Sequence, residues 1–278
     1  MAHLKKLTMI AFLTLAPMQI SPAWASSAGT APALGAEKSA IIHYGGRVFG
    51  IPVVSAKISA AFDGKSYAAR AELRTTGLAA FFKQIKVVAS AKGNVIAGEL
   101  STWEYWHKEL DGRKNRELSM KYGPDEVVVH VSPPLRSMGD PPASTAQRLE
   151  ALDPVSALLS LAMQGGPKSP LQQCSGQVKV FDGKQRYDLR LKPGGLKKIR
   201  TRAYKGLALR CDVWYVPVAG FNADDLENPE YDKPVTMWLA HELQAGMHIP
   251  VRFEAKLNFG TAVVEAKSID ISSNDNMD

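Results

Sequence analysis

The chain has 278 residues, and its 34 lysine and arginine side chains outnumber its 27 acidic ones, which gives a formal net charge of +7. This basic excess favours contact with anionic surfaces, although only weakly. Beyond residue 26 no stretch is apolar for about 18 residues, which excludes a later membrane-spanning helix.

The first residues, MAHLKKLTMIAFLTLAPMQISPAWASS, have the build of a secretory signal peptide. A Lys5-Lys6 pair precedes an apolar run over 7–20, and Ala23-Trp24-Ala25 is a small-x-small cleavage site. The apolar run is too short for a spanning helix, which needs about 20 residues. We therefore expect a signal peptide over 1–25, cleavage near Ala25, a flexible segment over 26–37 and residence in the periplasm. An uncleaved anchor is the alternative.

The tetrapeptide FDGK occurs twice, at 62–65 and at 181–184. Asp-Gly between alternating runs indicates a two-residue type I′ turn. Such a turn pairs the flanking phenylalanine and lysine in both hairpins. Phe62 then lies on the apolar face of its hairpin, whereas Phe181 does not, because a change of parity reverses every side chain. The repeat is therefore predicted to be the same turn made twice and not a copied binding loop.

Many short alternating runs separated by glycine-rich turns predict a mainly β protein. We expect a large, strongly curved antiparallel sheet or an open barrel, in a single domain over 38–272 with a disordered tail over 273–278. Two smaller domains are the alternative. The predicted strands lie near 39–48, 51–62, 65–74, 83–91, 95–108, 113–122, 125–131, 174–181, 185–192, 196–203, 206–218, 234–241, 249–259 and 262–271.

The two halves of the sheet, 38–131 and 173–272, are joined by a proline-rich loop and a helix over 132–172. Asp153 is a good N-cap and Pro154 suits the first helical position, so a helix is predicted over about 153–164. Its apolar stripe would cover one face of the sheet, or alternatively form a lid over a cavity.

Cys174 and Cys211 are the two cysteines, and in an exported chain such a pair usually forms one disulfide. Free buried thiols or a redox site are the alternatives, but the spacing is not C-x-x-C. If strands 185–192 and 196–203 separate the cysteines, their Cα atoms would lie roughly 14 Å apart, whereas a disulfide tolerates about 7 Å. Either the sheet curls, or Cys174 lies on a segment that folds back across it.

Two surface features could bind a ligand. One is a basic patch that could contact anionic lipid headgroups or an acidic protein, with a solvated sheet face as the alternative. It comprises Arg190, Lys192, Lys197, Lys198, Arg200, Arg202, Lys205 and Arg210. The other is a possible ligand groove at Trp106 and Trp214, which fall on the more polar parity of their strands; ordinary packing on the second face is the alternative.

Five stretches carry a family resemblance: HYGGRVFGIPVVSAKIS, LRTTGLAAFF, DPVSALLSL, YKGLALRCDVWYVPVAGF and IPVRFE. These stretches extend from about His43 to Glu254. In the order and spacing of these stretches, the chain resembles the domain of unknown function 3108 family of bacterial envelope proteins. The resemblance implies an exported antiparallel β fold similar to the lipoprotein carriers of the LolA and LolB type. It implies no reaction and no catalytic residues.

The search for chemistry is mostly negative. HELQAGMH begins like a zinc-protease helix at His241, but Ala245 stands where the second metal-binding histidine should be. The sequence has no G-x-S-x-G elbow, Walker loop or dinucleotide fingerprint. We therefore predict no catalytic residue, no metal site and no cofactor.

The sequence predicts a periplasmic, non-enzymatic envelope protein that binds a lipid, an acyl chain or a lipoprotein segment on its curved sheet. The alternative is a structural envelope protein that acts through protein–protein contacts and holds no internal ligand. An enzyme of unrecognised type ranks third. The first hypothesis needs an apolar cavity under the sheet, and the second needs a filled core. An exported protein would not meet nucleic acid, so none is expected as a partner.

Overall fold

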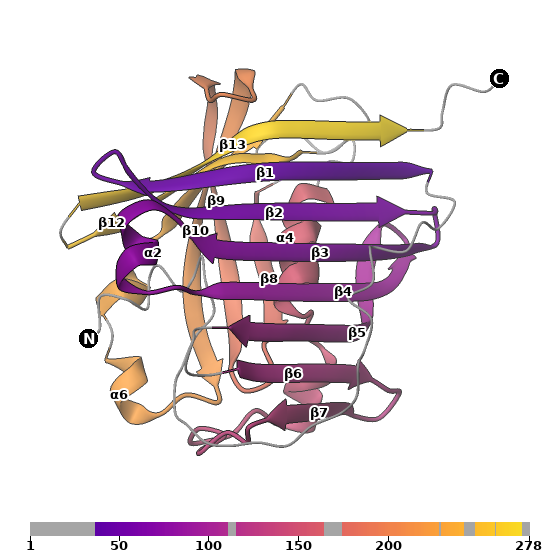
Figure 1. Ribbon diagram of the computed structural model, residues 1–278. Coiled ribbons are helices and arrows are strands. Elements are labelled where there is room, and N and C mark those ends of the chain that lie inside the picture. Colours follow the sequence, from indigo (N-terminus) through magenta and orange to yellow (C-terminus); the bar gives the residue numbers. More distant parts are fainter. Residues whose placement is uncertain are drawn as a thin grey trace.

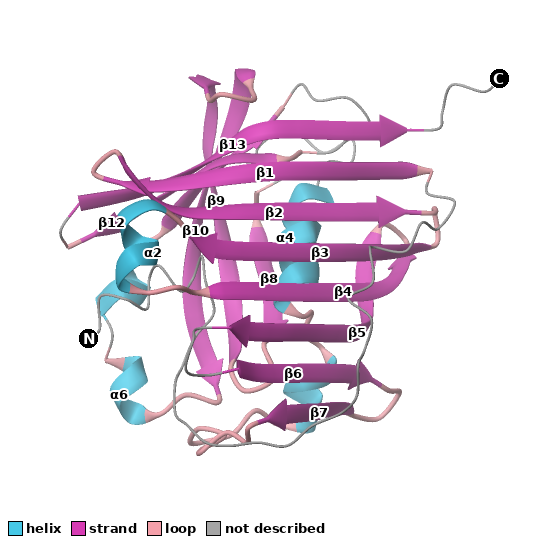
Figure 2. Ribbon diagram, in the orientation of Figure 1, coloured by secondary structure: helices cyan, strands magenta, loops and turns pink. Residues whose placement is uncertain are grey.

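The computed structural model describes residues 37–110, 115–163, 174–227, 229–241, 248–258 and 260–273. These residues form one 13-stranded antiparallel sheet and a few short helices, which Figure 2 separates by colour. The predicted mainly β fold with a large antiparallel sheet is confirmed. The signal peptide, the segment 26–36 and the tail after 273 lie outside the described residues.

The sheet runs in the order β7-β6-β5-β4-β3-β2-β1-β13-β12-β11-β10-β9-β8. Its first half comprises β1 (Lys38–Val48), β2 (Ile51–Phe62), β3 (Ser66–Thr75), β4 (Lys86–Ile96), β5 (Glu99–Leu110), β6 (Asn115–Tyr122) and β7 (Val127–Ser132). Its second half comprises β8 (Gly176–Phe181), β9 (Arg186–Arg200), β10 (Lys205–Ala219), β11 (Val235–Ala240), β12 (Pro250–Leu257) and β13 (Gly260–Ser273). The helices are α2 (Gly77–Phe82), α3 (Thr145–Leu149), α4 (Pro154–Met163), α6 (Ala223–Leu226) and the 3-10 helix η2 (Pro229–Asp232).

The sheet curls around α4, which confirms the helix predicted over 153–164 (Figure 1). The helix touches β3, β4 and β5 on one side and β8 on the other, so the two ends of the sheet face each other across it. The halves are joined by the pairing of β1 with β13, and β7 and β8 form the two edges. The sheet is therefore an open barrel filled by its own helix.

The two FDGK turns are alike, as predicted, but their predicted register and turn type are wrong. A type I′ turn needs positive φ at both central residues, whereas in each of these turns only the glycine has it. Phe62 pairs with Tyr67, and the N–H of Asp63 donates to the carbonyl of Ser66 at 3.2 Å, so the loop is Gly64-Lys65. The Asp63 carboxylate accepts the N–H of Ser66 at 2.6 Å, which holds the aspartate in the flanking position. Asp182 makes the matching bond to the N–H of Gln185. The sequence contains a further Asp-Gly pair at 111–112, which lies outside the described residues.

Phe181 was predicted to lie off the apolar face, and this is also wrong. Its side chain is fully buried beside Tyr105, Leu118 and Met120, and the Arg148 guanidinium lies 5.5 Å from its ring centroid. The curl brings the start of the β8–β9 turn against the inner face of β5 and β6. Both faces of this end of β8 are therefore buried.

The strands predicted at 185–192 and 196–203 are one strand, β9. The sequence Lys192-Pro193-Gly194-Gly195 resembles a turn, but it forms a register shift in the pairing of β9 with β10. A bulge of this kind keeps the strand continuous while it changes which side chains face inward. The result is a long β9–β10 hairpin whose far end projects past β13 at the top of Figure 1.

The predicted disulfide is confirmed. Cys174 is bonded to Cys211, and both are fully buried in a cluster with Leu209, Val213 and Met237. Cys174 precedes β8 and Cys211 lies on β10, so the bond spans β9.

Candidate functional site

The concave side of the sheet is occupied by the start of α4. The Asp153 carboxylate accepts the N–H groups of Val155 and Ser156 at 2.9 and 3.0 Å and the hydroxyl of Thr102 at 2.7 Å. The Tyr67 hydroxyl lies 2.6 Å from that of Ser156. Burial raises the pKa of Asp153, and it raises the pKa of Tyr67 to about 12. These bonds tie α4 to β3 and β5, which favours a structural helix over a lid.

Buried aromatic and charged side chains fill the rest of the interior. Desolvation raises the pKa of Tyr105 and of Tyr187 well above the ordinary value and also raises that of Asp182. Burial, with a smaller contribution from Arg116, lowers the pKa of His107 to about 4. His107 is therefore neutral at physiological pH. The described residues contain no group of three or more His, Cys, Asp or Glu side chains suited to a metal ion.

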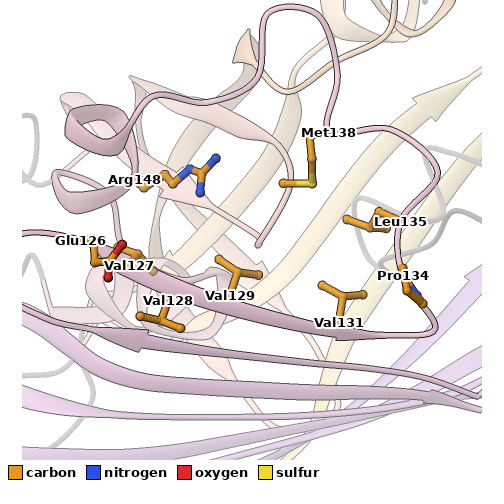
Figure 3. A pocket seen from close by; sticks show the side chains of 9 residues that line it. All are labelled: Glu126, Val127, Val128, Val129, Val131, Pro134, Leu135, Met138 and Arg148. Atoms are coloured by element: carbon orange, nitrogen blue, oxygen red, sulfur yellow. The ribbon is translucent and has the colours of Figure 1, made fainter.

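Outside this packed interior, a groove of about 490 Å³ runs along β7 (Figure 3). Val129 and Val131 point from the strand toward Leu135 and Met138 on the proline-rich loop. We call this feature the β7 groove, and its lining residues are Glu126, Val127, Val128, Val129, Val131, Pro134, Leu135, Met138 and Arg148.

The proline-rich loop stands away from β7 because it is anchored elsewhere. The N–H of Asp140 donates to the carbonyl of Phe221 at 2.8 Å, and the N–H of Gly220 donates to the carbonyl of Pro141 at 2.8 Å. A Cβ at Gly139 would overlap the backbone of Gly220, so glycine is required at this close approach. The loop is thus tied to the end of β10, and the β7 groove is formed before any ligand arrives.

The two edges of the sheet differ. The edge of β8 is covered by Leu152. The N–H of Leu152 donates to the carbonyl of Lys179 at 2.9 Å, and the N–H of Phe181 donates to the carbonyl of Leu152 at 2.8 Å. β7 pairs with β6 on one side, and its other side makes no backbone hydrogen bond to the described residues. An open edge offers unpaired N–H and C=O groups to an extended segment.

The residues predicted as a basic patch do not share one face. Register places Lys205 opposite Arg200 and Lys198 opposite Leu207, whereas Lys197 lies on the other side of β9 opposite Ala208. Arg202 lies in the turn between the two strands, and Lys192 is exposed farther along β9. The basic side chains therefore surround the projecting hairpin.

Two members of the predicted patch have partners within the β9–β10 hairpin, one across the strands and one along β10. The Arg190 guanidinium lies 5.6 Å from the Trp214 ring centroid, and Arg210 pairs with Asp212 at 3.0 Å. These two arginines are thus partly occupied in local structure.

The two tryptophans predicted to line a groove are not brought together. Trp106 is on β5, third in the sheet order, and Trp214 is on β10, eleventh in that order. Both alternate with buried residues, so they lie on the convex face. The Trp106 indole donates to Glu117 at 2.7 Å. Ligand binding at either residue stays a prediction.

Sequence reasoning missed the β7 groove and two phenylalanines on α2. Phe81 and Phe82 are 86% and 83% exposed. The sequence signal that could have indicated their exposure is that the two phenylalanines are adjacent and do not belong to a run of alternating apolar and polar residues. The groove had no such signal, because it depends on where the proline-rich loop is anchored.

A family model described as "Protein of unknown function (DUF3108)" matches residues 40–267. The chain belongs to the DUF3108 family. This confirms the family resemblance, whereas the likeness to LolA and LolB stays a prediction. No curated protein matches this DUF3108 chain.

Among solved structures, the DUF3108 chain is similar to a β-barrel-like protein of domain of unknown function DUF1849 from Brucella abortus. The two are 13% identical, and the alignment covers 86% of this chain and 98% of that one, with a TM-score of 0.47. In the part of the chain that the structure describes, no helix is long and apolar enough to cross a bilayer.

Proposed function

We propose that this protein is an exported, non-enzymatic cell-envelope protein that binds an extended lipoprotein segment, with or without its acyl chain, in the β7 groove. The observation that carries the proposal is a preformed groove of about 490 Å³ along the open edge of the sheet, with apolar side chains and polar atoms both in its lining. The disulfide is compatible with an oxidising compartment such as the periplasm.

The groove offers two kinds of contact to one extended chain. Unpaired backbone groups on the outer edge of β7 can add a strand, which supplies affinity independent of sequence. Val129 and Val131 are two positions apart on one face, so they would lie beside every second side chain of such a strand. Leu135 and Met138 close the groove from above with apolar contacts suited to aliphatic groups.

This location replaces the concave face that the sequence suggested. The concave face is occupied by α4, which is bonded to β3 and β5 through Asp153, Ser156 and Tyr67. Binding there would require removal of a buried, hydrogen-bonded helix. The β7 groove needs no such rearrangement, because its loop is already held at Gly220 and Phe221.

The alternative is a structural envelope protein that works through protein–protein contacts without a bound ligand. The filled core favours it, because the interior holds α4 and buried tyrosines where a lipid would otherwise lie. The two functions differ in whether a lipoprotein segment or its acyl chain occupies the β7 groove.

Native mass spectrometry of protein purified from its own periplasm, together with titration of a synthetic lipopeptide, tests the proposal. Leu135→Glu and Met138→Glu place a carboxylate in the groove, and each should weaken lipopeptide binding at least tenfold. Ile96→Glu, at the exposed end of β4 and away from the β7 groove, is the matched control and should bind like wild type. If wild type neither carries a ligand nor binds the lipopeptide, the structural alternative replaces this proposal.

A further inference from the structure

A second apolar surface, separate from the β7 groove, lies at one end of the molecule. Phe81 and Phe82 end the short helix α2, and their rings meet edge to face with centroids 5.7 Å apart. Both side chains are more than four-fifths exposed. Large apolar side chains that gather on a surface mark contact sites, whereas single ones need no explanation.

The β1–β2 turn adds to this surface. Phe49 is 69% exposed and Ile51 is 45% exposed, and both lie where β1 passes into β2. α2 packs against β2, and Figure 1 shows it beside the β1–β2 turn at the left end of the strands. We define Phe49, Ile51, Phe81 and Phe82 as the aromatic tip.

The aromatic tip is held firmly in place. The N–H of Thr76 donates to the carbonyl of Val53 at 3.0 Å, and a Cβ at Gly77 would lie 2.7 Å from the carbonyl oxygen of Pro52. The Thr75 hydroxyl donates to the carbonyl of Lys83 at 2.9 Å and accepts the N–H of Ile85 at 3.0 Å. The phenylalanines are therefore presented outward by fixed backbone.

Basic residues predominate in the segments that carry the aromatic tip. Residues 38–62 and 73–98 contain no aspartate or glutamate. Their basic residues nearest the tip in sequence are Arg47, Lys57, Arg74, Lys83 and Lys86. Arg47 is paired with Glu265 at 2.7 Å, while Lys86 and Arg74 are exposed at the base of α2. Basic side chains therefore outnumber acidic ones near the aromatic tip, with Glu72 on β3 and Glu265 on β13 as acidic neighbours.

We propose that the aromatic tip docks this protein on an anionic lipid bilayer, with Phe49, Phe81 and Phe82 entering the interfacial region and the neighbouring cations meeting lipid phosphates. Aromatic side chains concentrate at that depth, and basic residues beside them add attraction to anionic headgroups. Four exposed apolar side chains suit a bilayer, which needs no fitted pocket, better than they suit a protein partner, which needs roughly 800 Å² of complementary surface per side.

This docking is independent of the proposed function, because the aromatic tip and the β7 groove share no residue. In Figure 1 the tip lies at the left ends of β1–β4, whereas β7 is the edge strand at the bottom of the sheet. Each surface can therefore be altered without touching the other.

Cosedimentation of the full-length mature protein with phosphatidylglycerol–phosphatidylethanolamine vesicles tests the inference. We expect binding that falls in 0.5 M salt and is weak on phosphatidylcholine vesicles, since salt screens exposed charge. The variant Phe81→Ser/Phe82→Ser should bind at least tenfold more weakly, and Lys86→Glu should show a smaller loss. Ile96→Ser, which removes an exposed apolar side chain elsewhere, should bind like wild type.

Equal sedimentation of wild type and the double serine variant, or no sedimentation with any vesicle, would overturn the inference. So would a wild-type dimer in analytical ultracentrifugation that the double variant lacks, because the tip would then contact a second copy. The double variant should still bind the lipopeptide, and Met138→Glu should still bind vesicles. Failure of one surface is thereby distinguished from failure of the other.

Discussion

Cys174 and Cys211 are bonded with their Cα atoms 5.8 Å apart, although β9 lies between β10, which carries Cys211, and β8, which begins just after Cys174. Cys211 pairs with Pro193, and extending the register of Gly176 opposite Leu191 by two residues would also place Cys174 opposite Pro193. Two strand spacings of about 4.8 Å would then separate the cysteines by roughly 10 Å. The chain must therefore leave the sheet edge before β8 and cross the inner face of β9, with Gly176 at a φ of +84° where it turns.

The first prediction concerns this crosslink. Replacing both cysteines, as Cys174→Ala/Cys211→Ala, should lower the free energy of unfolding by about 4 kcal/mol in the chain-entropy treatment of a 37-residue loop. Urea unfolding measures the loss, and a reducing agent should destabilise wild type but leave the double variant unchanged. Peptide mapping under non-reducing conditions checks the bond itself, and two free thiols in periplasmic protein would contradict it.

The second prediction compares the glycines of the two FDGK turns. Gly64 and Gly183 have φ values of +82° and +98°, so alanine is strained at both, by roughly 1 kcal/mol. At Gly64 the new methyl group would meet the flexible end of Glu37, whereas at Gly183 it would overlap the buried Leu118 side chain. Gly183→Ala should therefore cost 1–3 kcal/mol more than Gly64→Ala, about the usual range for overpacking. Equal losses in urea unfolding would contradict the packing of this turn on β6.

Local chemistry made much of this fold predictable. The alternation of apolar residues located most strands, and Asp153-Pro154 marked the start of α4. The same local reading failed where a side chain or a distant contact decided the outcome. The Asp63 carboxylate accepts the N–H of Ser66, and the turn is shifted by one residue from the predicted register. The segment 193–195 causes a register shift in β9 but does not end the strand.

The candidate surfaces were less predictable because they depend on tertiary placement. Leu135 and Met138 become groove walls only because Gly139 to Pro141 are anchored to Gly220 and Phe221, some 80 positions away in sequence. Phe81 and Phe82 could equally have been core residues by composition, and only the anchoring of α2 turns them outward. The disulfide was predictable, because the expected export of the chain and its two cysteines favour one bond wherever the cysteines lie in the sequence.

The third prediction concerns the N-cap of α4. Asp153→Ala removes the acceptor of three buried hydrogen bonds and should cost about 3 kcal/mol. Ser144→Ala, at the exposed N-cap of α3, should cost about 1 kcal/mol and serves as the control. Thermal and urea unfolding measure both, and equal losses would mean that the anchorage of α4 adds nothing beyond an ordinary cap.

The same aspartate gives a fourth prediction, through Asp153→Asn. The folded pKa of Asp153 is raised by burial, so wild type loses stability as pH rises from the unfolded pKa of about 4 through the folded pKa. The neutral asparagine lacks this dependence and can still accept the helix N–H groups. The stability of Asp153→Asn relative to wild type should therefore increase from pH 4 to pH 7. A relative stability that falls over this range would mean that the carboxylate is ionised and favourably held in the fold.

The last prediction concerns His107, whose side chain is buried on β5 among Tyr105, Glu109 and Arg116. The Tyr105 hydroxyl lies 3.1 Å from its Nδ1, and Glu109 Oε1 lies 3.9 Å from its Nε2. Burial first, and then Arg116, lowers its pKa from 6.5 to about 4. As pH falls from 7 to 5, His107 becomes protonated in the unfolded chain but stays neutral in the folded chain. The free energy of unfolding of wild type should therefore fall by about 2 kcal/mol because of this residue. His107→Asn, which keeps a polar group near the Nδ1 position, should remove that loss, and the carboxylates titrating elsewhere cancel in the comparison. Urea unfolding of both proteins at pH 7 and pH 5 measures the difference, and parallel losses would show that His107 is charged in the fold, paired with Glu109.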